Sequence, residues 1–116
     1  MHESRGLGDV YKRQQEIYVA DQVLDYVADL AEATRKHVLI TLGLSPRGTL
    51  ALVRMAKAAA YMKERDYVIP KDVQEVFKDV AAHRMILDSK ARYQEKTARE
   101  ILSEILSEVP EPKVEG

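Results

Sequence analysis

Apolar residues recur with helical spacing over most of the chain, and this spacing predicts four main helices. The first helix begins near Asp21, which is expected to cap it. Its inward face consists of Val23, Val27, Leu30, Ala31 and Thr34, and its outer face carries Asp25, Asp29 and Glu32. Residues 35–37 are basic and close this helix, so acids come first and bases last, as the helix dipole favours.

The second helix is predicted over residues 46–64 and is apolar on most of its circumference, so we expect it at the centre of the fold. Its start is well marked, because Ser45 is a good N-cap and Pro46 suits the first helical position. Residues 38–42, between the first two helices, are β-branched and apolar. They could form a strand-like connector or extend the first helix, and periodicity does not decide between these alternatives.

Two further helices follow. After a turn at Asp66 and an extended piece at residues 67–69, Pro70 begins a third helix. Its inward residues are Val73, Val76, Phe77 and Val80. Residues 97–100 form a capping box that starts the fourth helix, which Pro110 ends. Its apolar stripe consists of Ile101, Leu102, Ile105, Leu106 and Val109. The whole pattern predicts an all-α bundle of four main helices with short extended connectors.

The length and composition limit the possible functions. With 116 residues the chain is at most one domain. Its 18 basic and 19 acidic residues leave a net charge of −1, so we expect neither nucleic-acid binding nor attraction to an anionic membrane. The chain contains no cysteine, which excludes disulfides and thiolate catalysis. No apolar run approaches the roughly 20 residues that span a bilayer. We therefore expect a cytoplasmic location and no insertion into a membrane.

The two ends of the chain differ from the helical part. Residues 1–14 have no sustained apolar period and no apolar core of a signal peptide. The stretch GLGDVYKRQ within them looks like foreign sequence joined to a truncated reading frame, and we interpret residues 1–16 as non-native or disordered. The folded domain is predicted over residues 17–112, followed by a polar, frayed tail at residues 113–116.

The second helix carries a cation where helices normally prefer an anion. From Pro46 to Lys63 there is no Asp or Glu, and Arg47 lies in the first turn. Unpaired backbone N–H groups, the positive end of the helix dipole and an added guanidinium together favour an anion, most often phosphate. The alternative is an arginine that simply points into water.

Four linked motifs give this helix start a context. They are Thr34-Arg35, the stretch LGLSPRG at residues 42–48, the stretch RDYVIPKDV at residues 65–73, and Ala82-His83-Arg84. In this order and at this spacing they resemble the C-terminal helical lid of MoxR-family AAA+ ATPases, a group related to the magnesium-chelatase ATPase subunit. The resemblance covers roughly residues 17–112. It departs from the family at Ile69, where a threonine often caps the following helix.

The resemblance implies a role for the turn formed by Ser45, Pro46, Arg47 and Gly48. In the family the arginine after Ser-Pro is the sensor-2 residue, which reaches from the lid to the phosphates of ATP on the neighbouring core domain. Arg47 would be this catalytic residue, and the four residues together would face the nucleotide. The intact protein would use ATP and Mg²⁺, assemble into a homo-oligomeric ring, often a hexamer, and act as a chaperone-like remodeller of an unidentified client. The chain alone is not expected to be an enzyme, because it lacks a phosphate-binding loop.

Other candidate sites are weaker. The three histidines share no ligand spacing, so no metal site is predicted. We expect Arg35 to be an ordinary cation at a helix C-terminus, with a contact to another subunit or to the core domain as the alternative. We expect His83 and Arg84 to anchor a turn or pair with a carboxylate. A second hypothesis is a free-standing helical interaction module, whose basic second helix docks an acidic peptide or a nucleic-acid backbone. A phosphate-binding loop encoded upstream of Gln14 would favour the ATPase lid over this module.

Overall fold

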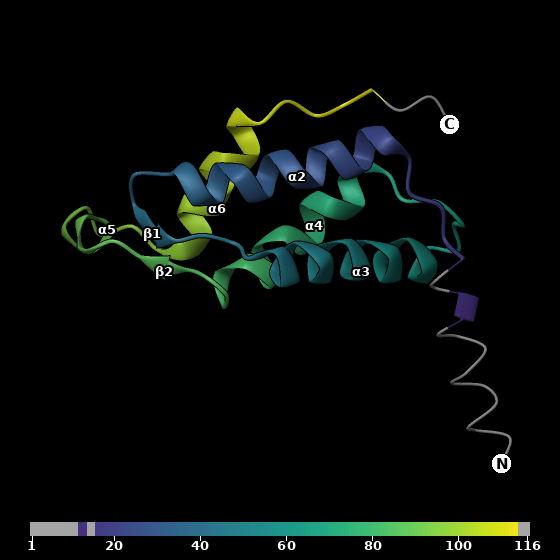
Figure 1. The fold of residues 1–116 in the computed structure, drawn as a ribbon, viewed down its shortest axis with the longest axis horizontal. Helices are drawn as coiled ribbons and strands as arrows, with labels where there is room; N and C mark the ends of the chain where they lie inside the picture. The colour runs from purple at the N-terminus through teal and green to yellow at the C-terminus, as the bar shows by residue number, and fades with distance from the viewer. Residues whose placement is uncertain (1–11, 14–15, 114–116) are drawn as a thin grey trace, which may run out of the picture.

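The computed structural model describes residues 12–13 and 16–113, and four main helices build the fold (Figure 1). These are α2 (Asp21–Lys36), α3 (Pro46–Met62), α4 (Pro70–Ala82) and α6 (Ala98–Glu108). From residue 16 to residue 113 the structure adds a short helix, α5 (Ser89–Tyr93), and two short strands, β1 (Ile40–Leu42) and β2 (Ile86–Leu87). The predicted all-α bundle with short extended connectors is confirmed, and α5 is an addition that the sequence pattern did not indicate.

The helices bury one apolar core, and α4 rather than α3 is its centre. Helix α4 contacts α2, α3 and α6, and its Val73 and Phe77 are completely buried. Helix α3 lies close against α4, and its buried side chains are the small or aliphatic Leu52, Ala56 and Ala60. The outer face of α3 remains exposed and carries Leu50, Met55 and Met62. The expectation of a central α3 was therefore wrong, because these apolar side chains stay exposed in the described part of the chain.

The short strands settle the alternatives for the segment after α2. Strand β1 pairs antiparallel with β2, with Ile40 opposite Leu87 and Leu42 opposite Ile86. The pairing continues where the Asp88 amide donates to the Leu39 carbonyl at 2.8 Å. The segment is thus a strand-like connector. Through this pairing, the segment after α2 lies beside the segment after α4.

Two helix boundaries differ from the expected ones. Asp21 is the first residue of α2 and Ala20 occupies the N-cap, so Asp21 contributes a charge to the first turn rather than a cap. Helix α3 ends before Glu64, which adopts the left-handed region with φ of 61°. The amide of Glu64 donates to the Tyr61 carbonyl and the amide of Arg65 to the Ala60 carbonyl, which is the Schellman pattern of helix termination. The predicted capping box of α6, formed by Thr97 and Glu100, is confirmed.

A buried carboxylate joins the end of α3 to the start of α4. Asp72 is fully buried and accepts hydrogen bonds from both terminal nitrogens of Arg65, at 2.6 and 2.7 Å, and from Lys63 at 3.3 Å. It also accepts the backbone amide of Ile69 at 2.9 Å, which is the half of a capping box that needs no polar side chain at the N-cap. Burial alone would raise the pKa of Asp72, but these hydrogen bonds outweigh burial and hold its pKa below the ordinary value.

The N-terminal side of the bundle begins with Ile17, which is buried. Tyr18 then pairs with the chain before α4, since its amide donates to the Asp66 carbonyl and its carbonyl accepts from the Val68 amide. Most of the segment 1–16, interpreted above as non-native or disordered, lies outside the described residues, as do residues 114–116 of the predicted tail.

Candidate functional site

The start of α3 has the cap that the sequence predicts. The Oγ of Ser45 accepts a hydrogen bond from the Gly48 amide at 3.1 Å, and Pro46 is the first helical residue. The carbonyl of Ser45 accepts the amide of Thr49 at 2.8 Å and its hydroxyl at 2.9 Å. The first turn is therefore held firmly, with Arg47 at its second position.

Arg47 is exposed and has no partner among residues 12–13 and 16–113. Neither its guanidinium nor its backbone amide makes a hydrogen bond there, and none of the ion pairs in this part of the chain includes it. The first turn also contains no acidic residue. An unpaired amide and an unpaired guanidinium at the positive end of a helix form a favourable place for an anion.

Gly48 lets two other side chains approach this turn. It is buried, and a Cβ atom at this position would lie 2.7 Å from Cδ1 of Leu44 and 3.4 Å from Cδ of Arg84. The stem of Arg84, which follows α4, thus passes beside the first turn of α3. The expected pairing of Arg84 with a carboxylate is not found among the described residues, so its charge adds to that of Arg47.

The end of α2 contacts the residue that precedes the cap. Nε of Arg35 donates to the Leu44 carbonyl at 2.7 Å, and its Nη2 donates to the Thr49 hydroxyl at 3.3 Å. The Thr34 hydroxyl accepts the Leu44 amide at 2.9 Å. The expectation that Arg35 is only a cation at a helix C-terminus missed these contacts, because the partner lies nine positions farther along the chain. The available signal was that Thr34-Arg35 is one of the four linked motifs.

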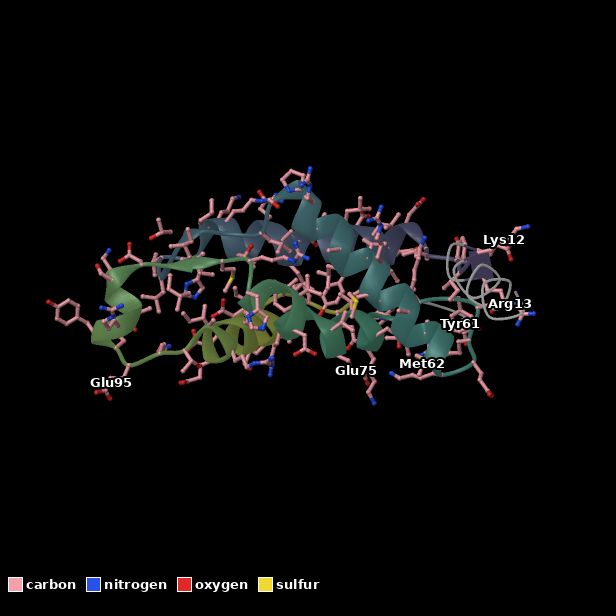
Figure 2. All side chains as sticks on the ribbon, turned by 90° about the horizontal axis from the view of Figure 1, so that it is seen from below. Lys12, Arg13, Tyr61, Met62, Glu75 and Glu95 are labelled. Carbon is pink, nitrogen blue, oxygen red and sulfur yellow. The ribbon has the colours of Figure 1, made fainter. Side chains whose placement is uncertain are left out.

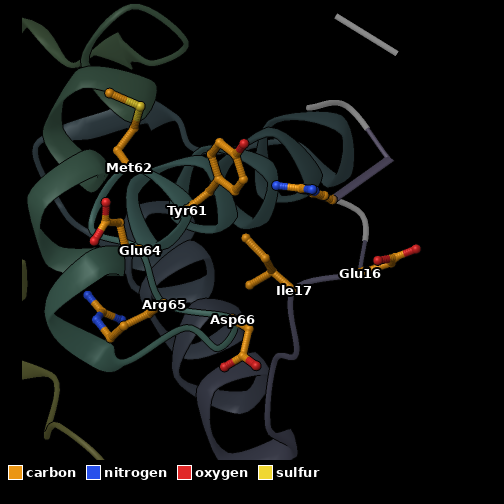
Figure 3. A pocket seen from close by; sticks show the side chains of 8 residues that line it. Glu16, Ile17, Tyr61, Met62, Glu64, Arg65 and Asp66 are labelled. Atoms are coloured by element: carbon orange, nitrogen blue, oxygen red, sulfur yellow. The ribbon is translucent and has the colours of Figure 1, made fainter. Parts of the chain in front are cut away.

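A hollow of about 820 Å³ lies elsewhere, beside the last turn of α3 (Figure 3). Arg13, Glu16, Ile17, Tyr61, Met62, Glu64, Arg65 and Asp66 line it. Figure 2 shows Lys12 and Arg13 near Tyr61 and Met62, at the end of the molecule away from Glu95. None of residues 45–48 contributes to this hollow, so it does not coincide with the candidate site.

The described residues include no group of three or more acidic, histidine or cysteine side chains that could hold a metal ion. The donors at the start of α3 suit an anion such as phosphate rather than a metal ion.

Within the described part of the chain, every helix is too short or too polar to cross a membrane.

Comparisons with known proteins agree with a helical lid. The AAA lid domain family matches residues 32–105. Over 98 residues the chain is 38% identical to YeaC of Bacillus subtilis, covering 84% of this chain and 31% of that protein. It is 35% identical to Chaperone MoxR1 of Mycobacterium tuberculosis, covering 88% of this chain and 30% of that protein. The crystal structure of a "putative ATPase" from Cytophaga hutchinsonii superposes with a TM-score of 0.81 at 31% identity, covering 88% of this chain and 34% of that one.

The chain therefore belongs to the AAA lid domain family and is a lid domain of the MoxR-type AAA+ ATPases. It spans about a third of the length of these relatives, between 30% and 34%.

Proposed function

We propose that this lid closes over ATP bound by an ATPase core domain and that Arg47 contacts the γ-phosphate as the sensor-2 residue. The observation that carries the proposal is the unpaired state of Arg47, within the described residues, in an acid-free first turn of a lid domain. Ser45, Pro46 and Gly48 would shape the turn that faces the nucleotide.

The chemistry required of the lid is electrostatic. During hydrolysis negative charge shifts between the γ-phosphate and the β-phosphate of the leaving ADP. A fixed guanidinium in a closed site stabilises that charge without reorganising. Closure of the lid would also couple the nucleotide state to domain movement. The phosphate-binding loop and the Mg²⁺ ligands would come from the core, because the described residues supply neither.

The role of the whole protein is inferred from its relatives. One relative is named as a chaperone, which supports a chaperone-like remodelling activity. AAA+ membership supports a homo-oligomeric ring, for which we propose a hexamer, acting in the cytoplasm on a client protein. ATP hydrolysis by the intact protein belongs to this proposal.

The proposal is tested by ATP turnover in a two-domain protein in which residues 17–113 follow an ATPase core. The core would come from the reading frame upstream of Gln14 or from a MoxR relative. Arg47→Ala is expected to lower kcat by about 10- to 1000-fold, the range for a lost electrostatic contact in a closed site. Arg47→Lys should restore only part of the rate, because lysine lacks the guanidinium fork.

Arg54 provides a matched control, since it is an exposed arginine on the same helix and has no ion pair within the described residues. Arg54→Ala should leave kcat within about twofold, as expected for a surface charge away from the reaction. Equal kcat values for the Arg47→Ala and Arg54→Ala variants would show that Arg47 is not the sensor-2 residue.

A further inference from the structure

We propose that Thr34 and Arg35 are positioning residues that set the place of Arg47 by holding Leu44. The two side chains bind the amide and the carbonyl of this one residue, and we call the arrangement the Leu44 clamp. The inference rests on the proposed function of Arg47, because it concerns how the start of α3 is held in place for contact with phosphate.

The first half of the clamp is buried. The Thr34 hydroxyl donates to the Ala31 carbonyl at 2.6 Å, which fixes the direction of its hydrogen. The same oxygen accepts the Leu44 amide at 2.9 Å. Thr34 and Leu44 are both fully buried, so no water competes for these bonds. The amide of Leu44 is thus bound to the last turns of α2.

The second half of the clamp reaches the cap of α3. Nε of Arg35 donates to the Leu44 carbonyl at 2.7 Å, and Nη2 of the same side chain donates to the Thr49 hydroxyl at 3.3 Å. That hydroxyl donates in turn to the carbonyl of the N-cap residue, Ser45, at 2.9 Å. One planar guanidinium therefore binds the residue before the cap and, through Thr49, the cap itself.

A comparison of Arg35 with Lys36, its neighbour at the end of α2, shows that Arg35 does more than neutralise the helix dipole. Lys36 also ends α2, and it pairs along the exposed surface with Glu32 at 2.9 Å. Arg35 instead directs its donors toward α3. A cation that served only the dipole of α2 would not need to bind the loop.

Backbone packing adds to the clamp. A Cβ atom at Gly43 would lie 2.6 Å from the backbone nitrogen of Arg35 and 2.6 Å from the carbonyl carbon of Thr34. The chain thus passes directly over the end of α2 just before Leu44. Only two residues separate Leu44 from Arg47, so a shift of Leu44 moves the guanidinium. Misplacement of a catalytic group by about 1 Å can cost up to about 100-fold in rate.

A double-mutant cycle on ATP turnover in the two-domain protein tests the positioning role. Arg35→Gln removes the guanidinium from an exposed side chain, and we expect kcat to fall by about 10- to 100-fold while KM for ATP changes less. In an Arg47→Ala background the same substitution should change kcat by less than about twofold, because the clamp acts through Arg47. The matched control Lys36→Gln removes a cation from the same helix end and should leave kcat unchanged in both backgrounds.

The exchange of the Leu44 amide with solvent deuterium tests the clamp itself in the 116-residue chain. Thr34→Val should speed this exchange, and Thr34→Ser, which keeps the hydroxyl, should restore protection. Unchanged protection in Thr34→Val, or an equal kcat loss from Arg35→Gln in both Arg47 backgrounds, would overturn the clamp. If Arg47→Ala itself leaves turnover intact, the sensor-2 proposal fails, whereas the exchange result still reports on the clamp.

Discussion

The two glycines on either side of Leu44 differ in what an added methyl group would meet. At Gly43 the methyl group would meet the backbone of Thr34 and Arg35, at 2.6 Å, and neither backbone can move without disturbing the end of α2. At Gly48 the nearest atom would be Cδ1 at the flexible end of the Leu44 side chain, at 2.7 Å. The two distances are similar, but a methyl group at Gly43 should destabilise the fold more than one at Gly48.

We predict that Gly43→Ala lowers the free energy of unfolding by about 1–3 kcal/mol, the usual range for overpacking. Gly48→Ala should cost less, because the added methyl group would meet side-chain atoms rather than backbone and because alanine is the better helix former. Urea unfolding of both variants, followed by circular dichroism, gives the comparison. A larger loss for Gly48→Ala than for Gly43→Ala would contradict the rigid approach of the chain to α2.

At the scale of single residues, the sequence predicts interactions within one helical turn better than interactions between distant elements. Ser45 and Pro46 were predicted correctly because a cap acts within one turn of its own helix. The contacts of Arg35 were not predicted, because the ordinary preference of a base for a helix C-terminus already explained its presence. Its actual acceptors belong to another element, and the folded backbone alone brings them together.

At the scale of elements, Asp72 ties α3 to α4. Its carboxylate accepts hydrogen bonds from Arg65 and Lys63 at the end of one helix and caps the backbone at the start of the next. The partners lie 7 and 9 positions before it, so the tie closes the turn between the helices. It explains why the motif RDYVIPKDV spans a helix boundary.

The lowered pKa of Asp72 predicts a pH-dependent stability. Because the pKa is lower in the folded state than in the unfolded chain, the unfolded chain takes up the proton first as the pH falls. The stabilisation that Asp72 gives the fold is therefore complete above the pKa of the unfolded chain, near 3.8. It is lost as the pH drops through the lower pKa of the folded state. Urea midpoints measured between about pH 6 and pH 2 should fall less steeply in Asp72→Asn than in the parent chain.

At neutral pH the Asp72→Asn change should cost about 1–3 kcal/mol, because it weakens buried hydrogen bonds to two cations. Asp79→Asn is the control, since Asp79 pairs with Arg99 on the exposed surface and such pairs contribute little. Equal pH profiles for Asp72→Asn and the parent chain would show that Asp72 does not carry this dependence.

Helices and strands were not equally predictable. Each main helix follows from local periodicity and capping residues, which act over a few positions. The pairing of β1 with β2 joins residues 40–42 to residues 86–87, and nothing in either short segment specifies its partner. The exposed side of α3 was also missed, because periodicity counts apolar residues without showing which of them find a neighbour.

At the scale of the whole molecule, the lid alone should bind ATP weakly and not hydrolyse it. One exposed guanidinium and one helix terminus cannot replace a phosphate-binding loop and a bound metal. Calorimetric titration of the 116-residue chain should show weak heats that decrease with added salt, as expected for exposed charges. Tight, Mg²⁺-dependent binding would reveal a nucleotide site within this chain that the start of α3 does not explain.

The contact between Arg47 and the γ-phosphate can be measured most directly by arginine footprinting. The two-domain protein would be treated with phenylglyoxal alone, with ADP and with a non-hydrolysable ATP analogue, and the modified arginines quantified by mass spectrometry. We predict strong protection of Arg47 by the ATP analogue, weaker protection by ADP, and unchanged reactivity of Arg54. Equal reactivity of Arg47 in all three samples, with nucleotide bound to the core, would contradict its role as the phosphate-contacting residue.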